Sequence, residues 1–213
     1  MGMTIAEKII ASHADTNDIA VGDIVRVRVD LVLANDITAP IAIREFRNAH
    51  GSLNDPDRVV FVLDHFTPTK DIASANQCKY VRDFAVEHGL KNFFEGGEAG
   101  VEHALLPEKG LVLPGDLVIG ADSHTCTYGA LGAFATGVGS TDVAAAMLTG
   151  TAWLRIPPSV KYVFEGSLRP WVGGKDLILY LIGAIGVDGA LYRAMEFAGP
   201  VISSLSMADR MSM

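Results

Sequence analysis

Short apolar segments that suit β-strands alternate with a helical pattern along the first two thirds of the chain. The run Arg58–Leu63 follows the turn Asn54–Asp57 and is rich in β-branched residues, which is typical of a buried strand. Between Asp71 and Gly89, apolar residues recur at steps of three and four and predict a helix. Lys91–Phe94 and Leu117–Gly120 have the composition of further short strands. This order of strand, helix and strand predicts an α/β sheet, in which ligands collect where the strands end.

Further elements are expected on either side of these segments. Thr4-Ile5-Ala6-Glu7 has the spacing of a capping box and predicts a helix over Ile5–His13. The alternation of apolar and charged residues in Ile24–Asp30 predicts a half-exposed strand. Gly110–Val112 is expected to form another short strand, and Thr141–Trp153 a helix.

The pair Pro157-Pro158 interrupts the pattern and predicts a domain boundary near Ile156. We expect a first α/β domain over residues 1–156 and the start of a second α/β domain over residues 157–213, beginning with a strand at Lys161–Phe164. Ser206–Asp209 has the spacing of another helix start, but the sequence stops four residues later. The second domain is therefore expected to be truncated, and the chain to be the amino-terminal part of a longer protein.

The composition excludes several classes of partner. The chain has 17 Lys and Arg against 25 Asp and Glu, a net charge of −8, so it lacks the broad basic surface of a nucleic-acid or anionic-membrane binder. Its longest apolar runs, such as Leu177–Val187, are too short to cross a bilayer. The two cysteines form no CxxC pair, which favours a reducing compartment, by default the cytoplasm.

Polar segments follow two of the predicted strands. Asp64-His65 comes directly after Arg58–Leu63, and a histidine held by a carboxylate can act as an acid or base near neutral pH. Asp64 could instead orient a different histidine, or cap the following helix in an ordinary turn. After Leu117–Gly120 come six polar residues, Asp122-Ser123-His124-Thr125-Cys126-Thr127, which are costly to bury unless a ligand or a hydrogen-bond network satisfies them. This segment predicts an enzyme site for a small anion.

Three neighbouring features allow both a functional and a structural interpretation. The glycines between Gly129 and Gly139 could let the backbone approach a ligand or could pack tightly, and Ser140-Thr141-Asp142 could cap the next helix. His103 could be a site residue or a satisfied core histidine. Cys78 lies on the apolar face of its helix and is expected to be an inert thiol.

Two other chemistries fit the sequence less well. A Ser-His-Asp hydrolase would need Ser123 on a GxSxG elbow, which is missing, and three adjacent side chains cannot form the triad geometry among themselves. A zinc site from His65, His103, His124 and Cys126 is chemically permitted, but these residues lack the compact spacing of zinc ligands.

Five motifs in this order resemble the aconitase superfamily. They are Asp64-His65, Gly100–His103 with Leu106–Gly110, Gly120–Thr125, Gly137–Asp142 and Val187–Ala190. The likeness covers essentially the whole chain and is strongest to the large subunits of isopropylmalate dehydratases, of the archaeal type shared with homoaconitase. It implies an aconitase-like, three-layer α/β iron–sulfur domain, of which the chain would supply the amino-terminal part.

The resemblance also implies an activity and roles for named residues. Such a hydro-lyase isomerises 2-isopropylmalate to 3-isopropylmalate in leucine biosynthesis by removing and re-adding water; a homoaconitase, a methylmalate-type dehydratase and a non-catalytic carboxylate-binding module are the alternatives. By this resemblance His65 would protonate the departing hydroxyl and Asp64 would support a histidine pair. His103 would pair with Asp122, while Ser123 and His124 would contact a carboxylate or hydroxyl of a hydroxy-di- or tricarboxylate substrate.

The family's cofactor and partner are expected to lie outside this chain. The resemblance implies a [4Fe–4S] cluster held by three cysteines in Cys-Thr-Asn and CxxC-type segments, neither of which occurs here. Cys126 does not match a ligand position, so no metal ligand is expected before Met213 and the chain alone should bind no cluster. A separate small subunit would complete the site, and without it and the cluster we expect no catalysis.

Overall fold

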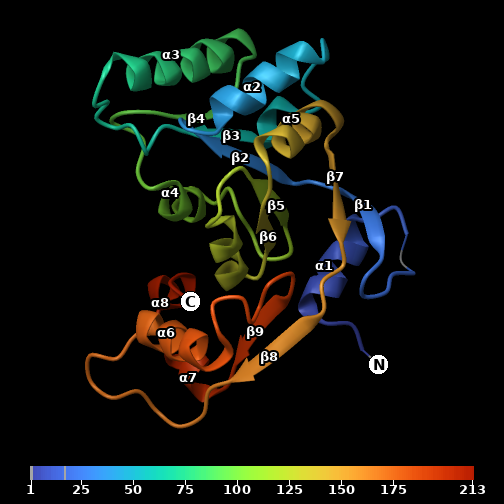
Figure 1. Ribbon diagram of the computed structural model, residues 1–213, viewed down its shortest axis with the longest axis vertical. Helices are drawn as coiled ribbons and strands as arrows, with labels where there is room; N and C mark the ends of the chain where they lie inside the picture. The colour runs from blue at the N-terminus through green and yellow to red at the C-terminus, as the bar shows by residue number, and fades with distance from the viewer. Residues whose placement is uncertain (1, 17) are drawn as a thin grey trace.

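A five-stranded parallel sheet forms the centre of the computed structural model, which describes residues 2–16 and 18–213 (Figure 1). Its strand order is β4-β3-β2-β5-β6. The strands are β2 (Leu31–Asn35), β3 (Val59–Val62), β4 (Asn92–Phe94), β5 (Leu117–Gly120) and β6 (Phe134–Gly137). The chain adds β3 and β4 on one side of β2, then returns to add β5 and β6 on its other side. The sheet therefore has a topological switch point between β2 and β5.

Helices cover both faces of this sheet, and the alternation of side chains along each strand explains why. In β3, Val59 and Phe61 belong to one hydrophobic core, whereas Val60 and Val62 belong to another. The first core is closed by α2 (Ala39–Asn48), α3 (Ile72–Glu87) and α5 (Ser140–Thr149), and the second by α4 (Glu102–Glu108) and the 3₁₀ helix η2 (Thr125–Leu131). The predicted three-layer α/β fold is confirmed.

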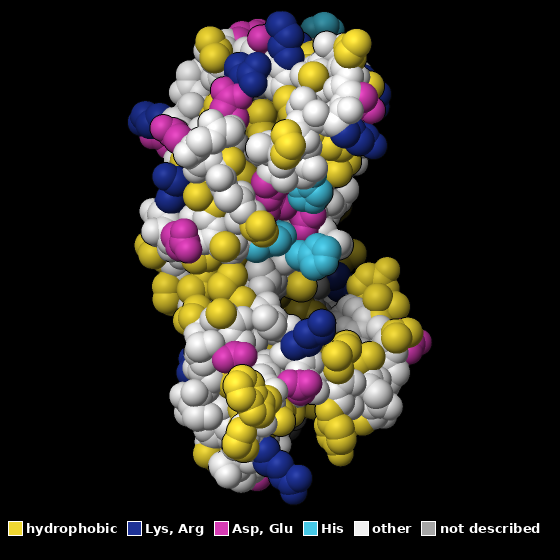
Figure 2. All heavy atoms as spheres, turned by 90° about the vertical axis from the view of Figure 1, so that its left-hand side faces the viewer, with side chains coloured by type: hydrophobic (Ala, Val, Ile, Leu, Met, Phe, Trp, Pro, Cys, Tyr) yellow, Lys and Arg dark blue, Asp and Glu magenta, His cyan; other side chains and the backbone are white. Residues whose placement is uncertain are grey.

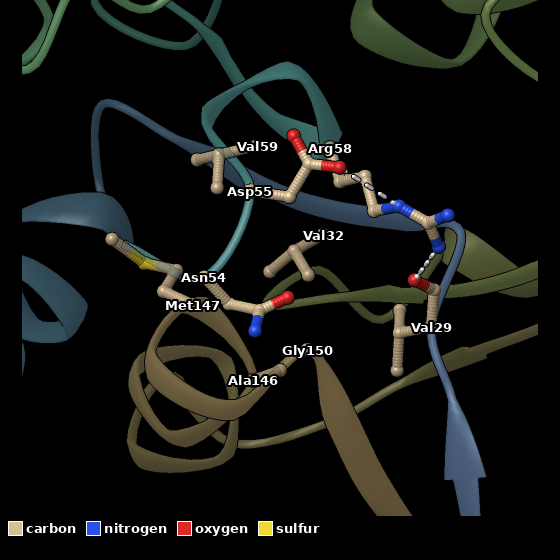
Figure 3. A pocket seen from close by; sticks show the side chains of 9 residues that line it. All are labelled: Val29, Val32, Asn54, Asp55, Arg58, Val59, Ala146, Met147 and Gly150. Atoms are coloured by element: carbon tan, nitrogen blue, oxygen red, sulfur yellow. Dashed lines mark hydrogen bonds and ion pairs between the residues drawn. The ribbon is translucent and has the colours of Figure 1, made fainter. Parts of the chain in front are cut away.

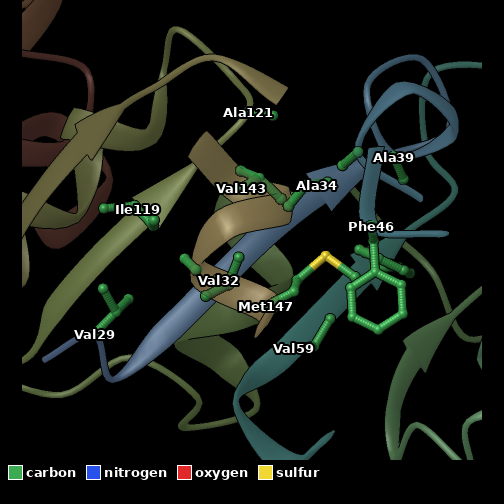
Figure 4. Close-up of a cluster of buried hydrophobic side chains, with 14 of the residues drawn as sticks. Val29, Val32, Ala34, Ala39, Phe46, Val59, Ile119, Ala121, Val143 and Met147 are labelled. Carbon is green, nitrogen blue, oxygen red and sulfur yellow. The ribbon is translucent and has the colours of Figure 1, made fainter. Parts of the chain in front are cut away.

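The first core is the larger of the two and fixes α2, α3 and α5 to the sheet. Phe46 of α2 meets Phe84 of α3 edge to face, with ring centroids 5.4 Å apart. Met147 of α5 lies close to Phe46 and above Val32 and Val59 of the sheet (Figure 4). Each such fully buried side chain contributes roughly 1.5–3 kcal/mol of transfer free energy, so the strand ends are held on a rigid scaffold.

Several elements form where the sequence predicts them. α1 spans Ile5–His13, and its Thr4–Glu7 capping box is present. The predicted strand Ile24–Asp30 is β1 (Ile24–Arg28), and η1 (Pro56–Arg58) occupies the turn before β3. However, β2, α2 and β6 were not predicted as separate elements, because β2 follows the preceding strand after only two residues and β6 lies inside the glycine-rich stretch.

Two of the predicted elements are wrong. Gly110–Val112 is not a strand: Gly110 has a φ of 68°, and the segment forms a turn and a bend. The helix expected over Thr141–Trp153 stops at Thr149, because Gly150 adopts a left-handed C-cap conformation with a φ of 68°. The β-branched and aromatic residues that follow form β7 (Thr151–Arg155), which pairs antiparallel with β1.

The residues after Pro158 form a smaller unit with its own two-stranded parallel sheet. Its elements are β8 (Ser159–Val163), α6 (Gly174–Ile185), β9 (Ala194–Ala198), α7 (Pro200–Ser204) and α8 (Met207–Met211). α8 packs against η2, where the Thr127 hydroxyl donates to the Met211 carbonyl at 2.6 Å. The separate sheet supports our proposal of a domain boundary near Ile156.

None of the helices in the described residues combines the length and hydropathy needed to cross a membrane.

Candidate active site

Polar side chains gather at the carboxyl ends of β2, β3 and β5, next to the switch point of the sheet. Asn35 ends β2 and Asp36 follows it, Asp64-His65 follows β3, and Asp122-Ser123-His124 follows β5. Figure 2 shows histidine and carboxylate side chains collected at mid-height on one face of the molecule. In open α/β sheets the loops diverge at a switch point and leave a crevice that binds ligands. The topology therefore places these residues where a site is expected.

His103 and Asp122 form one acid–base pair. His103 lies in the first turn of α4, and its Nε2 is 2.9 Å from Asp122 Oδ1. The same oxygen accepts the His124 backbone N–H at 2.7 Å. Burial raises the pKa of Asp122, but the hydrogen bonds from His124 and His103 outweigh it and hold the pKa below its ordinary value. Asp122 is therefore a stable carboxylate that orients His103, which is half-buried rather than enclosed in the core.

Asp64 and His65 form a second pair. His65 Nδ1 is 2.6 Å from Asp64 Oδ1, and the other Asp64 oxygen accepts the Glu102 backbone N–H at 2.7 Å. Asp64 thus holds its own neighbour and also caps α4, whereas the helix that follows it, α3, is capped by Asp71. Burial lowers the pKa of His65, but the hydrogen bond and charge of Asp64 raise it further, so the net shift is upward.

The fully buried Asp36 holds the loop that carries His65. Its carboxylate accepts the backbone N–H groups of His65, at 3.2 Å, and of Phe66, at 2.6 Å. The Cys78 thiol lies 3.8 Å from the same carboxylate, and burial and this charge raise the pKa of Cys78. Cys78 is thus a buried thiol, as the sequence predicts.

Glu102 lies between the two pairs and was not among the residues predicted for the site. Its side chain is 1% exposed, with Oε1 3.3 Å from Asn35 Nδ2 and 3.5 Å from His103 Nε2. Burial and the charge of Asp64 raise the pKa of Glu102 to about 8. An acidic residue in the first turn of a helix is common on the surface, so only the packing of α4 against the sheet distinguishes this one.

Ser123 and His124 form the exposed rim of the site. The His124 side chain is 79% exposed, and its Nδ1 is 3.3 Å from both Ser123 Oγ and Asp122 Oδ1. A hydrolytic triad needs the nucleophile and the carboxylate on opposite ring nitrogens. Because both groups approach the same nitrogen, the arrangement does not support the hydrolase alternative.

The four residues considered as a zinc site, His65, His103, His124 and Cys126, are not brought together in one group. Within the described residues, two groups of three have nitrogen and oxygen atoms within 4.8 Å of one another: His103, Asp122 and His124 in one, Asp36, Asp64 and His65 in the other. The hydrogen bonds within each group account for this closeness. Cys126 joins neither group; its Sγ is directed at the Ser123 carbonyl, 3.9 Å away, and burial raises the pKa of its thiol.

An iron–sulfur cluster does not fit the cysteines of this chain. Such clusters are held by thiolates, usually three or four. The sequence contains only Cys78 and Cys126, and the surroundings of both disfavour the thiolate. The residues present therefore form no cluster site.

Gly137 in the glycine-rich stretch, and Gly120 before the site loop, are packed tightly against their neighbours, whereas Gly129 is not. A Cβ on Gly120 would lie 2.3 Å from Thr125 Oγ1, and one on Gly137 would lie 2.7 Å from the Asp122 carbonyl oxygen. The Thr125 side chain and the Asp122 backbone thus fill the space that a side chain at these two positions would need. The next helix is capped by Gly139, whose N–H donates to Asp142, with Ser140 as its first residue.

A hollow at the opposite edge of the sheet is too small to be a rival site. It is lined by residues of β2, β3 and α5, with Arg58 held by Asp55 and the Val29 carbonyl (Figure 3). Its volume of about 10 Å³ is at the lower limit for a single water molecule.

Comparisons with known proteins identify the family of this chain. Residues 7–213 match the model of the aconitase family, described as aconitate hydratase. The chain belongs to the aconitase family. Among curated members of this family, the 3-isopropylmalate dehydratase large subunit of Syntrophus aciditrophicus (strain SB) is 65% identical over 211 residues, 99% of this chain and 50% of that protein.

Two further relatives carry the same name and similar identity. The 3-isopropylmalate dehydratase large subunit of Desulfatibacillum aliphaticivorans is 66% identical over 214 residues, 100% of this chain and 51% of that protein. The 3-isopropylmalate dehydratase large subunit 1 of Pyrococcus furiosus is 63% identical over 213 residues, 100% of this chain and 50% of that protein. The chain thus spans about half the length of the aconitase-family relatives it matches.

Proposed function

We propose that this chain belongs to a 3-isopropylmalate dehydratase large subunit, a hydro-lyase that isomerises 2-isopropylmalate to 3-isopropylmalate in leucine biosynthesis by removing and re-adding water. The observation that carries the proposal is the pair of Asp–His contacts at the switch point of the sheet. It is supported by the match of essentially the whole chain to large subunits of that name. Moving water across a carbon–carbon bond requires proton donors and acceptors held at fixed positions.

The chain's own residues supply acid–base groups and polar contacts for a hydroxy acid. His65, whose pKa is raised by its contact with Asp64, keeps its proton to a higher pH than an ordinary histidine and donates it to the departing hydroxyl. His103, oriented by Asp122, provides the second proton-handling group. Ser123 and His124, both exposed at the rim, contact a carboxylate or hydroxyl of the substrate. Each side chain is positioned by a strand end or a helix start, which favours precise orientation.

The remaining parts of the enzyme are proposed to come from outside these residues. A [4Fe–4S] cluster, which the family implies, would act as a Lewis acid on the substrate hydroxyl when bound. Its cysteine ligands and a separate small subunit would be supplied by other segments and another chain. The two cysteines are unpaired in the structure, which supports a reducing compartment such as the cytoplasm.

Anaerobic assays of the full-length large subunit with its small subunit test this proposal. We expect turnover of isopropylmalate in preference to homocitrate and dimethylmalate. Preference for homocitrate would identify the enzyme as a homoaconitase, and preference for dimethylmalate as a methylmalate-type dehydratase. Inactivity on all three, with the cluster absorbance present, would refute the hydro-lyase function.

A matched pair of histidine variants tests the position of the site. His124→Ala should lower kcat by about 100-fold or more, because the side chain is exposed at the rim and contributes to the site rather than to packing. His50→Asn is the control: His50 is exposed beyond the far end of α2 with a φ of 52°, which asparagine tolerates. Equal activity of the two variants would place the site elsewhere.

A further inference from the structure

We propose that Glu102 is a positioning residue that stays a neutral carboxylic acid in the resting site and fixes the two Asp–His pairs relative to each other. The inference rests on the proposed function for its kinetic consequence, but not for its structural one. Among the described residues of the site, only Glu102 contacts members of both Asp–His pairs.

Glu102 touches both pairs through separate atoms. Its backbone N–H donates to Asp64 Oδ2 at 2.7 Å, and its carbonyl accepts the Tyr128 hydroxyl at 3.4 Å. The ring of His103, in turn, has Nδ1 3.2 Å from that hydroxyl and Nε2 3.5 Å from Glu102 Oε1. The residue therefore connects the Asp64–His65 pair, through α4, to the His103–Asp122 pair.

The distribution of partners places a proton on Oε2 of Glu102. Asn35 Nδ2 donates to Oε1, so that oxygen serves as the acceptor. Oε2 is buried, and no described residue offers it a hydrogen bond. A buried, unpartnered carboxylate oxygen is far more costly than a protonated one. The neutral acid is therefore the form that this environment stabilises.

The surrounding charges favour the same form. Two partly buried histidines, His65 and His103, and the exposed His124 approach three carboxylates at the strand ends, and an ionised Glu102 would add a fourth negative charge to this cluster. Burial and Asp64 raise the pKa of Glu102 to about 8, although Asn35 and His65 oppose the shift. The titratable groups that face Glu102 from the neighbouring elements are Asp64, His65, His103, Asp122 and Tyr128.

Ionisation of Glu102 should slow the reaction. A new negative charge next to His65 holds the imidazolium proton more tightly and repels the carboxylates of an anionic substrate. Both effects act in the same direction, so the rate should fall as the pH rises through the pKa of Glu102.

Kinetics of the full-length enzyme with its small subunit test this effect. In wild type, kcat/KM should fall with a midpoint near pH 8, the pKa of Glu102. Glu102→Gln keeps an acceptor for Asn35 and a neutral donor at the other atom, so it should cost less than about 10-fold in kcat and remove this alkaline fall. Glu102→Ala should cost about 100-fold. Glu98→Gln, at an exposed position on the preceding loop, is the control that should retain the wild-type profile.

An infrared difference spectrum provides a readout that does not depend on activity. Wild type minus Glu102→Gln should show the C=O band of a protonated carboxyl at pH 7 that is lost by pH 9.5. The band would support a neutral Glu102 even if the enzyme were inactive on all three hydroxy acids, in which case only the proposed function fails. Absence of the band, or an alkaline fall in Glu102→Gln at the wild-type midpoint, would overturn the inference.

Discussion

Asp64 and His65 pair with each other although they are neighbours in the chain. Successive side chains point to opposite faces within a strand, but β3 ends at Val62, so both residues lie beyond that constraint. The sequence identifies them as polar residues after a strand but leaves open which histidine Asp64 holds. Glu102 and Asp36 could not be selected at this scale, because their importance arises from burial between elements far apart in the chain.

The raised pKa of His65 predicts a pH-dependent effect of Asp64. The protonated ring is stabilised in the folded state, so this contribution is complete below the ordinary histidine pKa of about 6.5 and is lost as pH rises through the higher folded value. In Asp64→Asn, the titration midpoint of His65 should move down, as measured by NMR of labelled histidine. Asp83→Asn, exposed on α3, should leave it in place. An unchanged midpoint in Asp64→Asn would show that Asp64 does not hold the ring.

At the scale of elements, the sequence predicted several buried strands and the turns beside them. It did not predict which strands pair with each other. The β-branched run before Asp64 and the helix after Asp71 carry strong periodicity, and both are confirmed. Trp153 was assigned to a helix because helical apolar spacing continues past Gly150, yet pairing with β1 decides its conformation. β6 was not recognised because it lies among glycines, of which Gly137 is packed against the Asp122 loop.

That contact makes Gly137 sensitive to substitution. In Gly137→Ala the new methyl group would lie 2.7 Å from the Asp122 carbonyl oxygen and 3.3 Å from Ser123 Cα, so either β6 or the site loop must move. We expect a loss of about 1–3 kcal/mol in the free energy of unfolding, measured by urea denaturation. Gly129→Ala, with no atom within 4 Å of the added Cβ, should differ from wild type by far less. Equal stability of the two variants would contradict this packing.

For the whole molecule, the strand order explains how short polar segments far apart in the sequence form one site. β2 and β5 are adjacent in the sheet although about eighty residues separate them, and the switch point between them brings Asp36, Asp64 and Asp122 to one edge. The sequence predicted that the Asp64 and Asp122 segments follow strands, but it predicted neither β2, which precedes Asp36, nor the order of the strands. Family members of about twice this length match the chain, and we propose that the edge is one wall of a larger site.

The turnover of Asp122→Asn tests most directly whether this edge performs acid–base chemistry. Asp122 accepts hydrogen bonds from His103 and from the His124 backbone, and asparagine preserves its size while removing its charge. In the full-length protein assembled with its small subunit, hydration of isopropylmaleate should fall by about 100-fold or more while the cluster absorbance is unchanged. Turnover within twofold of wild type would contradict the assignment of this edge as the active site.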